Sequence, residues 1–387
     1  MQLVAYGAQD IYLTGNPQIT FWKVVYRRCT NFAIESVEQT FMGNATPGSR
    51  ATATISRNGD LVSNCVLEVV AKVAAAGKKL PASGIHNLIE SVEVEIGGQK
   101  IDKHYAAWLQ IWNELSNAHY GPNDADDAPC KSGYGKAVGN DLASTTDVTL
   151  YVPLVFWFNR NPGLALPLIA LQYHEVKFNF QFATADAIRG TGNAATVGSI
   201  KMFVDYIYLD TEERRRFAQQ SHEYLIDQVQ YTGAVSRTAA AGASQSLRLD
   251  FNHPCKELVW VLRETTAGDG SGHATDFKDI GTQGGTALLQ LNGHDRFAKR
   301  PMNYFTRVQT MQHHTNVPAG DRIGVYSFGL RPEDHQPSGT CNFSRIDNAT
   351  LQLNDAGNGA QDEYQVYATN YNVLRIMSGM GGLAYSN

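Results

Sequence analysis

The chain is poor in cysteine, and its cysteines are not spaced like a common metal or redox motif. It has five, an odd number, and no two form a C-x-x-C pair. A disulfide framework or a zinc ribbon therefore has no support in the sequence. We predict buried free thiols in a protein made in a reducing compartment, at Cys29, Cys65, Cys130, Cys255 and Cys341.

The chain also lacks an excess of positive charge. It has 32 Lys and Arg residues against 37 Asp and Glu residues, which gives a formal net charge of −5. The basic run Arg214–Arg216 directly follows Glu212 and Glu213, which largely neutralise it. Binding to nucleic acid depends on a positive field over the phosphates. We therefore expect no direct nucleic acid binding.

Long hydrophobic runs are missing as well. The longest, LYVPLVFWF (150–158) and LALPLIAL (164–171), are too short for a bilayer-spanning helix and contain proline. The first ten residues, MQLVAYGAQD, have neither a basic region nor an apolar region like those of a secretory signal. The sequence predicts a soluble protein that is not secreted by the usual route.

No catalytic motif is complete. The pairs His174-Glu175 and His222-Glu223 open like a zinc-protease motif, but neither has a histidine three residues after the glutamate. There is no G-x-S-x-G elbow and no Walker loop. The glycines in SGMGGLAY (378–385) have no helix after them to complete a phosphate site, so they predict a flexible C-terminal turn. We predict that the protein is not an enzyme.

Metal-binding signals are equally incomplete. Asp124, Asp126 and Asp127 offer oxygen ligands for calcium, but no glutamate follows where an EF-hand needs one. A solvated loop tip is the alternative that we favour. His313 and His314 are adjacent, and adjacent histidines rarely share a face. We therefore predict no catalytic, cofactor-binding or metal residues, and no cofactor.

Three segments fit the acceptor pattern for N-glycosylation. They begin at Asn44, Asn342 and Asn348. Because the chain shows no secretory signal, the match alone carries little weight.

What the chain does contain is the signature of many short strands. It has 35 glycines and 18 tyrosines, and apolar residues alternate with polar ones in several segments. This period of two predicts half-buried strands in antiparallel β-sandwiches. The alternating sets are Val92, Val94 and Ile96; Val176, Phe178, Phe180 and Phe182; Leu247, Leu249 and Phe251; and Ala349, Leu351 and Leu353.

The strand plan occurs twice. Residues 92–105 (VEVEIGGQKIDKHY) and 287–300 (ALLQLNGHDRFAKR) both place a strand, a glycine turn and a polar basic stretch in that order. The strand, proline-containing bend and second strand of residues 151–180 recur in the same order in residues 325–353. A chain of 387 residues suits two domains. The sequence therefore predicts two similar domains, which suits a building block better than a catalyst.

Helices are few and two polar loops are long. Ile101, Tyr105, Trp108, Trp112 and Leu115 recur at helical spacing and predict one helix, ended by Gly121-Pro122. A second short helix over Thr211–Gln220 could bridge the two halves. The loops at 120–147 and 263–286 are long enough to be functional or disordered.

Several ordered blocks resemble one protein family from end to end. They are GAQDIYLTGNPQITFWK (7–23), ISRNGDLV (55–62), IGGQKIDKHY (96–105), NPGLALPLIALQYHEVK (161–177), VDYIYLDTEERRRFA (204–218), QPSGTCNFSRIDNATL (336–351) and NYNVLRIMSGMGGLAY (370–385). The sequence is similar to the major capsid proteins of large icosahedral DNA viruses, the nucleocytoplasmic group, and most of all to the chlorella-virus type.

The resemblance implies an all-β fold, a double jelly roll of two tandem eight-stranded antiparallel sandwiches with a few short helices in loops. It divides the chain into an N-terminal arm (1–24), a first jelly roll (25–211), a linker (212–222) and a second jelly roll (223–387). It implies a homotrimeric capsomer with a nearly hexagonal outline that tiles an icosahedral shell. The arm, with Ile19, Phe21 and Trp22 as apolar anchors, would face the inside of the shell, although a plain first strand is an alternative.

The implied partners are neighbouring capsomers and minor capsid proteins, with possible inner-face contact to an internal membrane. The implied location is the virion shell, assembled in the host cytoplasm. Chlorella-virus capsid proteins carry glycans in an Asn-Thr context that is missing here, including from the short loop 354–363. Glycosylation is therefore not assigned to any position. The alternative function is a minor or vertex capsid paralogue that binds host-surface carbohydrate through its outer loops.

Overall fold

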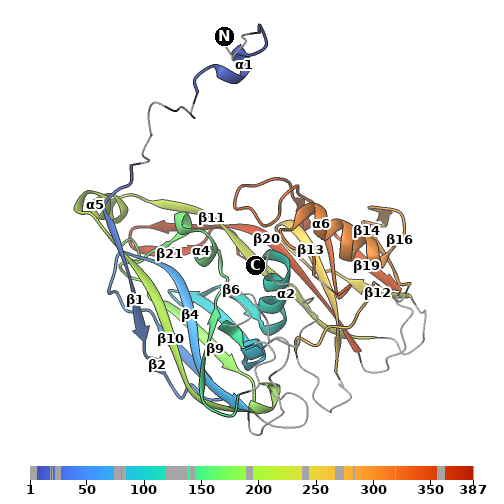
Figure 1. The fold of residues 1–387 in the computed structure, drawn as a ribbon, viewed down its shortest axis with the longest axis horizontal. Helices are drawn as coiled ribbons and strands as arrows, with labels where there is room; N and C mark the ends of the chain where they lie inside the picture. Colours follow the sequence, from blue (N-terminus) through green and yellow to red (C-terminus); the bar gives the residue numbers. More distant parts are fainter. Residues whose placement is uncertain are drawn as a thin grey trace, which may run out of the picture.

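The protein folds into two β-sandwiches that lie side by side, with strands forming most of the regular secondary structure (Figure 1). This confirms the predicted all-β double jelly roll. The computed structural model describes residues 7–386 except 18, 20, 22–27, 74–79, 81–83, 118–136, 140–143, 189–194, 238–243, 266–273, 282–283, 319 and 355–361.

The first sandwich consists of two antiparallel sheets. One has the order β1 (Phe32–Gln39), β10 (Ala195–Leu209), β4 (Leu61–Val73) and β7 (Val148–Pro153), with β8 (Leu166–Pro167) paired to β4. The other has the order β2 (Phe41–Met42), β3 (Arg50–Thr54), β9 (Val176–Phe182), β5 (Ile89–Ile96) and β6 (Gln99–Tyr105).

The alternating strands place their apolar side chains between these two sheets, as predicted. Along β9, Val176, Phe178, Phe180 and Phe182 are buried while the residues between them remain partly exposed. The rings of Phe180 and Phe182 stack with centroids 5.6 Å apart. The stacked rings thus form an aromatic ladder at the centre of this core. Burial of each such side chain stabilises the fold by about 1.5–3 kcal/mol.

The second sandwich repeats this plan. One sheet has the order β11 (His222–Ser236), β20 (Asp362–Met377), β13 (Pro254–Glu264) and β17 (Ile323–Ser327), with β18 (Cys341–Asn342) on β13 and β21 (Met380–Leu383) on β20. The other has the order β12 (Ser244–Arg248), β19 (Ala349–Asn354), β14 (Thr286–Leu291) and β15 (His294–Asp295), with β16 (Arg300–Pro301) on β14.

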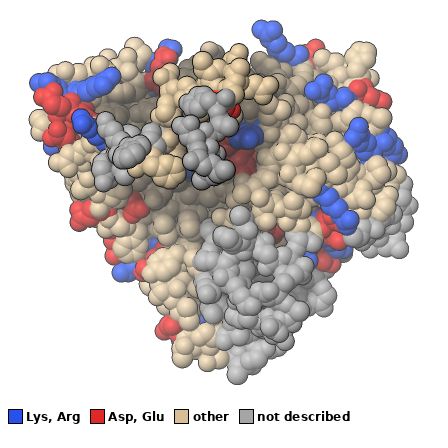
Figure 2. Space-filling model, turned by 45° about the horizontal axis from the view of Figure 1, so that its top comes forward, with Lys and Arg blue, Asp and Glu red and all other residues tan. Residues whose placement is uncertain are grey.

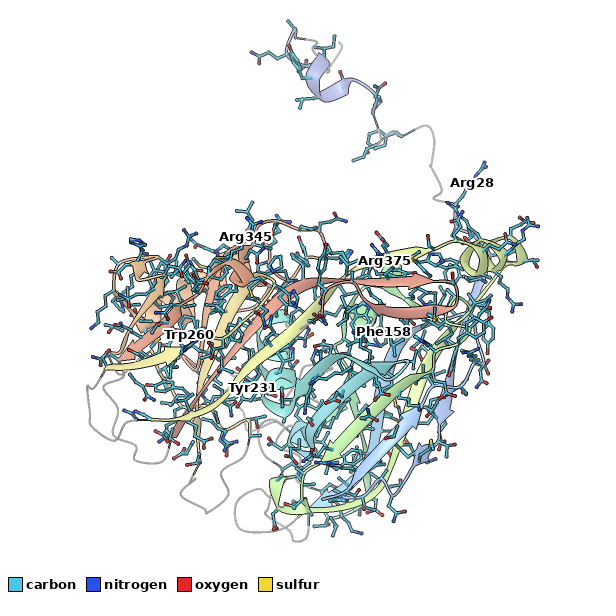
Figure 3. The ribbon with its side chains drawn as sticks, turned by 180° about the vertical axis from the view of Figure 1, so that it is seen from behind. Arg28, Phe158, Tyr231, Trp260, Arg345 and Arg375 are labelled. Carbon is cyan, nitrogen blue, oxygen red and sulfur yellow. The ribbon has the colours of Figure 1, made fainter. Side chains whose placement is uncertain are left out.

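The core of the second sandwich is mainly aliphatic. Leu351 and Leu353 of β19 are buried against Leu289 of β14, and Trp260 and Phe305 fill the centre. Figure 3 places Phe158 within the first sandwich, Trp260 within the second, and Tyr231 between the two. Each half of the chain thus has its own hydrophobic core.

The repeated strand plan is confirmed by topology. The sheet orders β1-β10-β4-β7 and β11-β20-β13-β17 correspond strand for strand, as do β3-β9-β5-β6 and β12-β19-β14-β15. The two echoed hairpins also match, because β5 and β6 turn at Gly97-Gly98 and β14 and β15 turn at Asn292-Gly293. Asn292 and Gly293 both have positive φ, at 51° and 79°, the geometry for which Asn-Gly is favoured.

The helices connect and cover the sheets. The expected linker helix is present as α5 (Thr211–Gln219), which joins β10 to β11. The others in the described part of the chain are α1 (Ile11–Thr14), α2 (Ala106–Ser116), α4 (Trp157–Arg160) and α6 (Gln309–His313), with short turns η1 (Gly84–Leu88), η2 (Pro162–Leu164), η3 (Ala185–Ile188), η4 (Tyr304–Val308) and η5 (Phe343–Arg345).

Two predictions about elements were wrong. The helix predicted to include Ile101 and Tyr105 begins only at Ala106, because residues 99–105 pair with β5 as strand β6. It ends at Ser116, whereas its predicted stop, Gly121-Pro122, lies outside the described residues. Of the C-terminal glycines predicted to form a flexible turn, only Gly379 lies in a turn, because residues 380–383, with Gly381 and Gly382, pair with β20 as strand β21.

The thiol prediction holds only in part. Cys65 and Cys255 are buried and free, and burial raises the pKa of both thiols, so they are inert. Cys341 is partly exposed and Cys29 is exposed, since it lies at the start of the chain body before β1. Cys130 lies outside the described residues. Among the described residues, no helix is long and apolar enough to cross a bilayer.

Candidate functional site

The surface where the two sandwiches meet is the most highly organised feature outside the cores. Helix α2 belongs to the first sandwich, yet its Trp108 and Ile111 are buried against the outer face of the second. There they form one apolar cluster with Val259 of β13, Val325 of β17 and Tyr367 of β20. The rings of Trp108 and Tyr367 lie 5.6 Å apart. Packing of this kind fixes two domains as one rigid unit.

Two edge strands face each other beside this cluster. The backbone N–H of Val229 in β11 donates to Asp102 Oδ1 in β6 at 3.0 Å. Gln228 Nε2 donates to the carbonyl of Ile101 at the same edge. Side chains thus satisfy edge groups that a neighbouring strand would otherwise satisfy, which protects both edges from pairing with other chains.

A buried charge cluster lies at the same joint. Lys256 Nζ is 2.9 Å from Asp227 Oδ2, and Arg160 Nη1 of the first sandwich is 3.7 Å from the same oxygen. The Lys256 ammonium also lies 4.9 Å from the centre of the Tyr371 ring, and the Arg160 guanidinium stacks 4.1 Å from that of Trp112. Lys256 is only 2% exposed. Removing the carboxylate would leave two buried cations without their partner.

The C-terminal end of α2 is held by the second sandwich. Asn316 donates from its backbone N–H to the carbonyl of Leu115 at 2.9 Å and from Nδ2 to that of Glu114 at 2.8 Å. These carbonyls have no partner within the helix. The end of one domain's helix is thus completed by a loop of the other.

His314 forms a second buried ionic cluster, which the sequence prediction missed. Its Nε2 lies 3.0 Å from Glu257 Oε2 and its Nδ1 lies 2.8 Å from Glu333 Oε1. Burial alone would lower the pKa of His314, but the two carboxylates outweigh burial and raise the pKa to about 9. The ring is therefore an imidazolium at neutral pH that fastens the loop after β17 onto β13.

The other histidines that the sequence singled out, His174, His222 and His313, each contact a backbone carbonyl. His174 Nδ1 lies 3.0 Å from the carbonyl of Gly381, and His222 Nε2 lies 2.8 Å from that of Phe217. His313 turns toward the carbonyl of Leu330, away from the partners of His314. The two adjacent histidines therefore have different partners. Among the described residues, no group of three or more His, Cys, Asp or Glu residues could hold a metal ion.

The remaining predicted sites lie on the surface or outside the described residues. Asn44, Asn342 and Asn348 are exposed, and Asn342 accepts from the backbone N–H of Ser344 at 3.0 Å. Asp124, Asp126 and Asp127 lie outside the described part of the chain, as do most of residues 120–147 and parts of 263–286.

Two surfaces of the described residues expose several large apolar side chains. The first is the N-terminal arm, which stands apart from the sandwiches in Figure 1 and exposes Ile11, Tyr12, Leu13, Ile19 and Phe21 by 69–104%. The second is the outer face of the sheet β1-β10-β4-β7, where Phe32, Ile34 and Tyr151 are 50%, 59% and 41% exposed. Elsewhere, Figure 2 shows Lys and Arg residues intermixed with Asp and Glu residues. Apolar surfaces of this kind mark contacts with other molecules.

A signal for the buried joint was present in the sequence. The segment KELVWVL (256–262) does not alternate apolar and polar residues as the strands of the first sandwich do. An unbroken apolar run indicates a strand covered on both faces. Nothing in the sequence identified His314 and Glu257 as partners, because they are far apart along the chain.

Comparison with known proteins agrees with this architecture. Residues 20–210 match the family model for the N-terminus of the major capsid protein, and residues 213–382 match that of the large eukaryotic DNA virus major capsid protein. The chain is 52% identical to the major capsid protein of Pyramimonas orientalis virus, with 100% of this chain and 99% of that protein aligned. It is 46% identical to that of Paramecium bursaria Chlorella virus 1, with the same coverage.

Solved structures give the same result. The crystal structure of PBCV-1 VP54 aligns with a TM-score of 0.81 and 41% identity, covering 95% of this chain and all of that chain. The Faustovirus major capsid protein, at 14% identity, shares the fold with a TM-score of 0.69 over 96% of this chain and 94% of that chain. The chain therefore belongs to the family of major capsid proteins of large eukaryotic DNA viruses.

Proposed function

We propose that three copies of this structural protein form a capsomer with a nearly hexagonal outline, and that such capsomers tile an icosahedral shell. The observation that carries the proposal is the duplicated sandwich. Two equivalent sandwiches per chain, taken three times, give six similar wedges, and six wedges suit a hexagonal lattice. A closed ring of identical contacts also prevents open-ended growth.

The rigid joint supports this role. Trp108 and Ile111 bury an apolar contact between the sandwiches, while Asp227 and Asn316 bind groups across it. A shell subunit must present its outer contacts at fixed angles to its neighbours. A joint with both apolar and ionic contacts holds those angles better than a flexible linker does.

The domain boundaries proposed for assembly are an arm (1–24), a first jelly roll (25–211), a linker (212–222) and a second jelly roll (223–387). The strands of the first sandwich run from Phe32 to Leu209 and those of the second from His222 to Leu383. The exposed apolar side chains of the arm suit contact with a minor capsid protein on the inner side of the shell. We place the protein in the virion shell, with assembly in the host cytoplasm.

The native mass of the purified chain tests the proposal. Light scattering should give about three times the chain mass of 42.5 kDa, and the mass should not change on dilution through the micromolar range, as expected for an obligate oligomer. Electron microscopy of concentrated protein should then show hexagonal particles. A monomer at every concentration would refute the trimeric capsomer and leave the fold unchanged.

A further inference from the structure

The two sandwiches are equivalent, but only one has its outer face covered. In the second sandwich, Tyr367, Val259 and Val325 form one row across β20, β13 and β17, and all three are buried under α2. In the first sandwich, one outward-facing row across the equivalent strands β10, β4 and β7 is Phe203, Val66 and Pro153. These three remain partly exposed, and Tyr151 in the next row is 41% exposed.

The helix that follows the echoed hairpin in the second sandwich corresponds to α2. Residues 104–116 and 300–312 align without a gap, and the side chains that enter their own cores agree. Leu109 of α2 is buried in the first core, and its counterpart Phe305 is buried in the second. The buried polar positions also agree, since Gln110 corresponds to Thr306 and Asn113 to Gln309. The segment η4–α6 is therefore the counterpart of α2.

The face that α2 uses to cover its neighbour is open on this counterpart. Trp108, Trp112 and Leu115 of α2 correspond by position to Tyr304, Val308 and Met311, whereas Ala107 and Ile111 of the same covering face correspond to the polar residues Asn303 and Arg307. Leu115 is 1% exposed, whereas Met311 is 65% exposed. Tyr304 and Val308 are also partly exposed. Within the chain, α2 of the first sandwich covers the outer sheet face of the second. Among the described residues, the counterpart helix η4–α6 and the equivalent sheet face of the first sandwich both remain uncovered.

Strands β4 and β10 lie at the left of Figure 1 and helix α6 at the right, in the other sandwich, so the two open faces do not meet within one chain. We infer that the Tyr304-Val308-Met311 face of one copy packs on the Phe203-Val66-Pro153 face of the next copy, repeating between chains the contact that α2 makes within the chain. The partner is a second copy of this chain, because the chain carries both the open helix face and the open sheet face and already makes one such helix-on-sheet contact internally. This inference rests on the proposed trimer.

Shape and charge agree with this contact. A hollow of about 400 Å³ opens on the sheet face, lined by Val66 and Pro153 together with Asn64, Asp205 and Trp112, among others. It is large enough for a side chain of the size of methionine or tyrosine. Asp205 and Glu68 place carboxylates on this face, and Arg307, which pairs with Asp321 of its own chain and has a side chain that is 60% exposed, lies one turn from Met311 on the helix. Such a contact has unlike halves, so it gives a closed trimer when each copy is rotated by a third of a turn from the last.

The substitution Met311→Asp tests the helix half. An unpaired carboxylate in the apolar contact should weaken it about 30-fold or more, and light scattering should show the mass falling from that of a trimer towards 42.5 kDa. Met42→Asp is the matched control, because Met42 on β2 is 66% exposed and lies outside both faces. Thermal unfolding should show that both variants fold as the wild type does.

The substitution Val66→Arg tests the sheet half and should also break the trimer. Combining it with Met311→Asp places opposite charges at the two halves, so the double variant should regain trimer. A wild-type trimer that survives Met311→Asp and Val66→Arg would overturn this interface and leave the capsomer in place. A wild-type monomer would overturn the capsomer, and the interface with it.

Discussion

The two sandwiches have the same strand order but treat their outer faces differently. In the first, β4 alternates buried Leu67 and Val69 with partly exposed Glu68 and Val70. In the second, nearly every residue of the equivalent strand β13 is buried, including Lys256 and Glu257. The inward residues of each strand follow the fold, whereas the outward residues follow what covers them. The residue type at an outward position therefore indicates what packs on that sheet, whereas the strand order does not.

The cores differ as well. Strand β9 of the first sandwich places phenylalanines at the inward positions, while its counterpart β19 places Ala349, Leu351 and Leu353 there. The same alternation with different volumes gives the same sandwich, because the pattern of burial sets the sheet and the side chains fill the space available.

The largest effect is expected in the first core. Phe180→Asp should abolish folding of the first sandwich, because a buried charge without a partner replaces an aromatic side chain stacked on Phe182. Soluble yield and circular dichroism measure the loss. Gln181→Asp on the same strand is the control, since Gln181 is partly exposed beside Arg50 and should keep the fold. A soluble Phe180→Asp protein that unfolds like the wild type would contradict the assigned facing of β9.

The next effect sharpens the contrast between the outer faces. Asp227→Ala should lower the free energy of unfolding by about 3–5 kcal/mol, because Lys256 and Arg160 lose their buried partner. Glu68→Ala on the open face of the first sandwich should change it by less than about 0.5 kcal/mol in the monomer. Denaturant unfolding measures both values. Equal losses would mean that the two outer faces are equally covered.

The smallest effect is a dependence on pH in the second sandwich alone. The pKa of His314 is raised to about 9 from 6.5, so the stability from its ion pairs is complete below pH 6.5 and is lost as the pH rises through 9. The loss should be roughly 3 kcal/mol. Burial would raise the pKa of Glu257, but His314 and Lys256 lower it, so its carboxylate is charged while His314 is protonated.

Unfolding in denaturant between pH 6 and 10 measures this step. His314→Gln should remove it, whereas His313→Gln should retain it, because His313 contacts only the carbonyl of Leu330 among the polar groups of the described residues. A step that persists in His314→Gln would assign the titration to another group.

The alternating strands and the repeated plan could be predicted because each follows from local pattern. Helical spacing also fitted Ile101 and Tyr105, and the strand won there because β5 supplied backbone partners. Strand β21 was missed for the same reason, since pairing with β20 overrides the glycine content of a short segment. The ionic partners of His314 depend on three distant segments meeting, which no local pattern encodes.

The joint formed by α2 also reduces the entropic cost of assembly. Six separate sandwiches would need five association events to close a ring, whereas three chains need two. Each event costs an estimated 4–15 kcal/mol of translational and rotational freedom. Because each chain joins two sandwiches covalently and packs Trp108 on Tyr367, three of these five losses of freedom occur when the chains fold and not when they associate. The contacts between chains therefore have to offset only the two remaining costs when the ring closes.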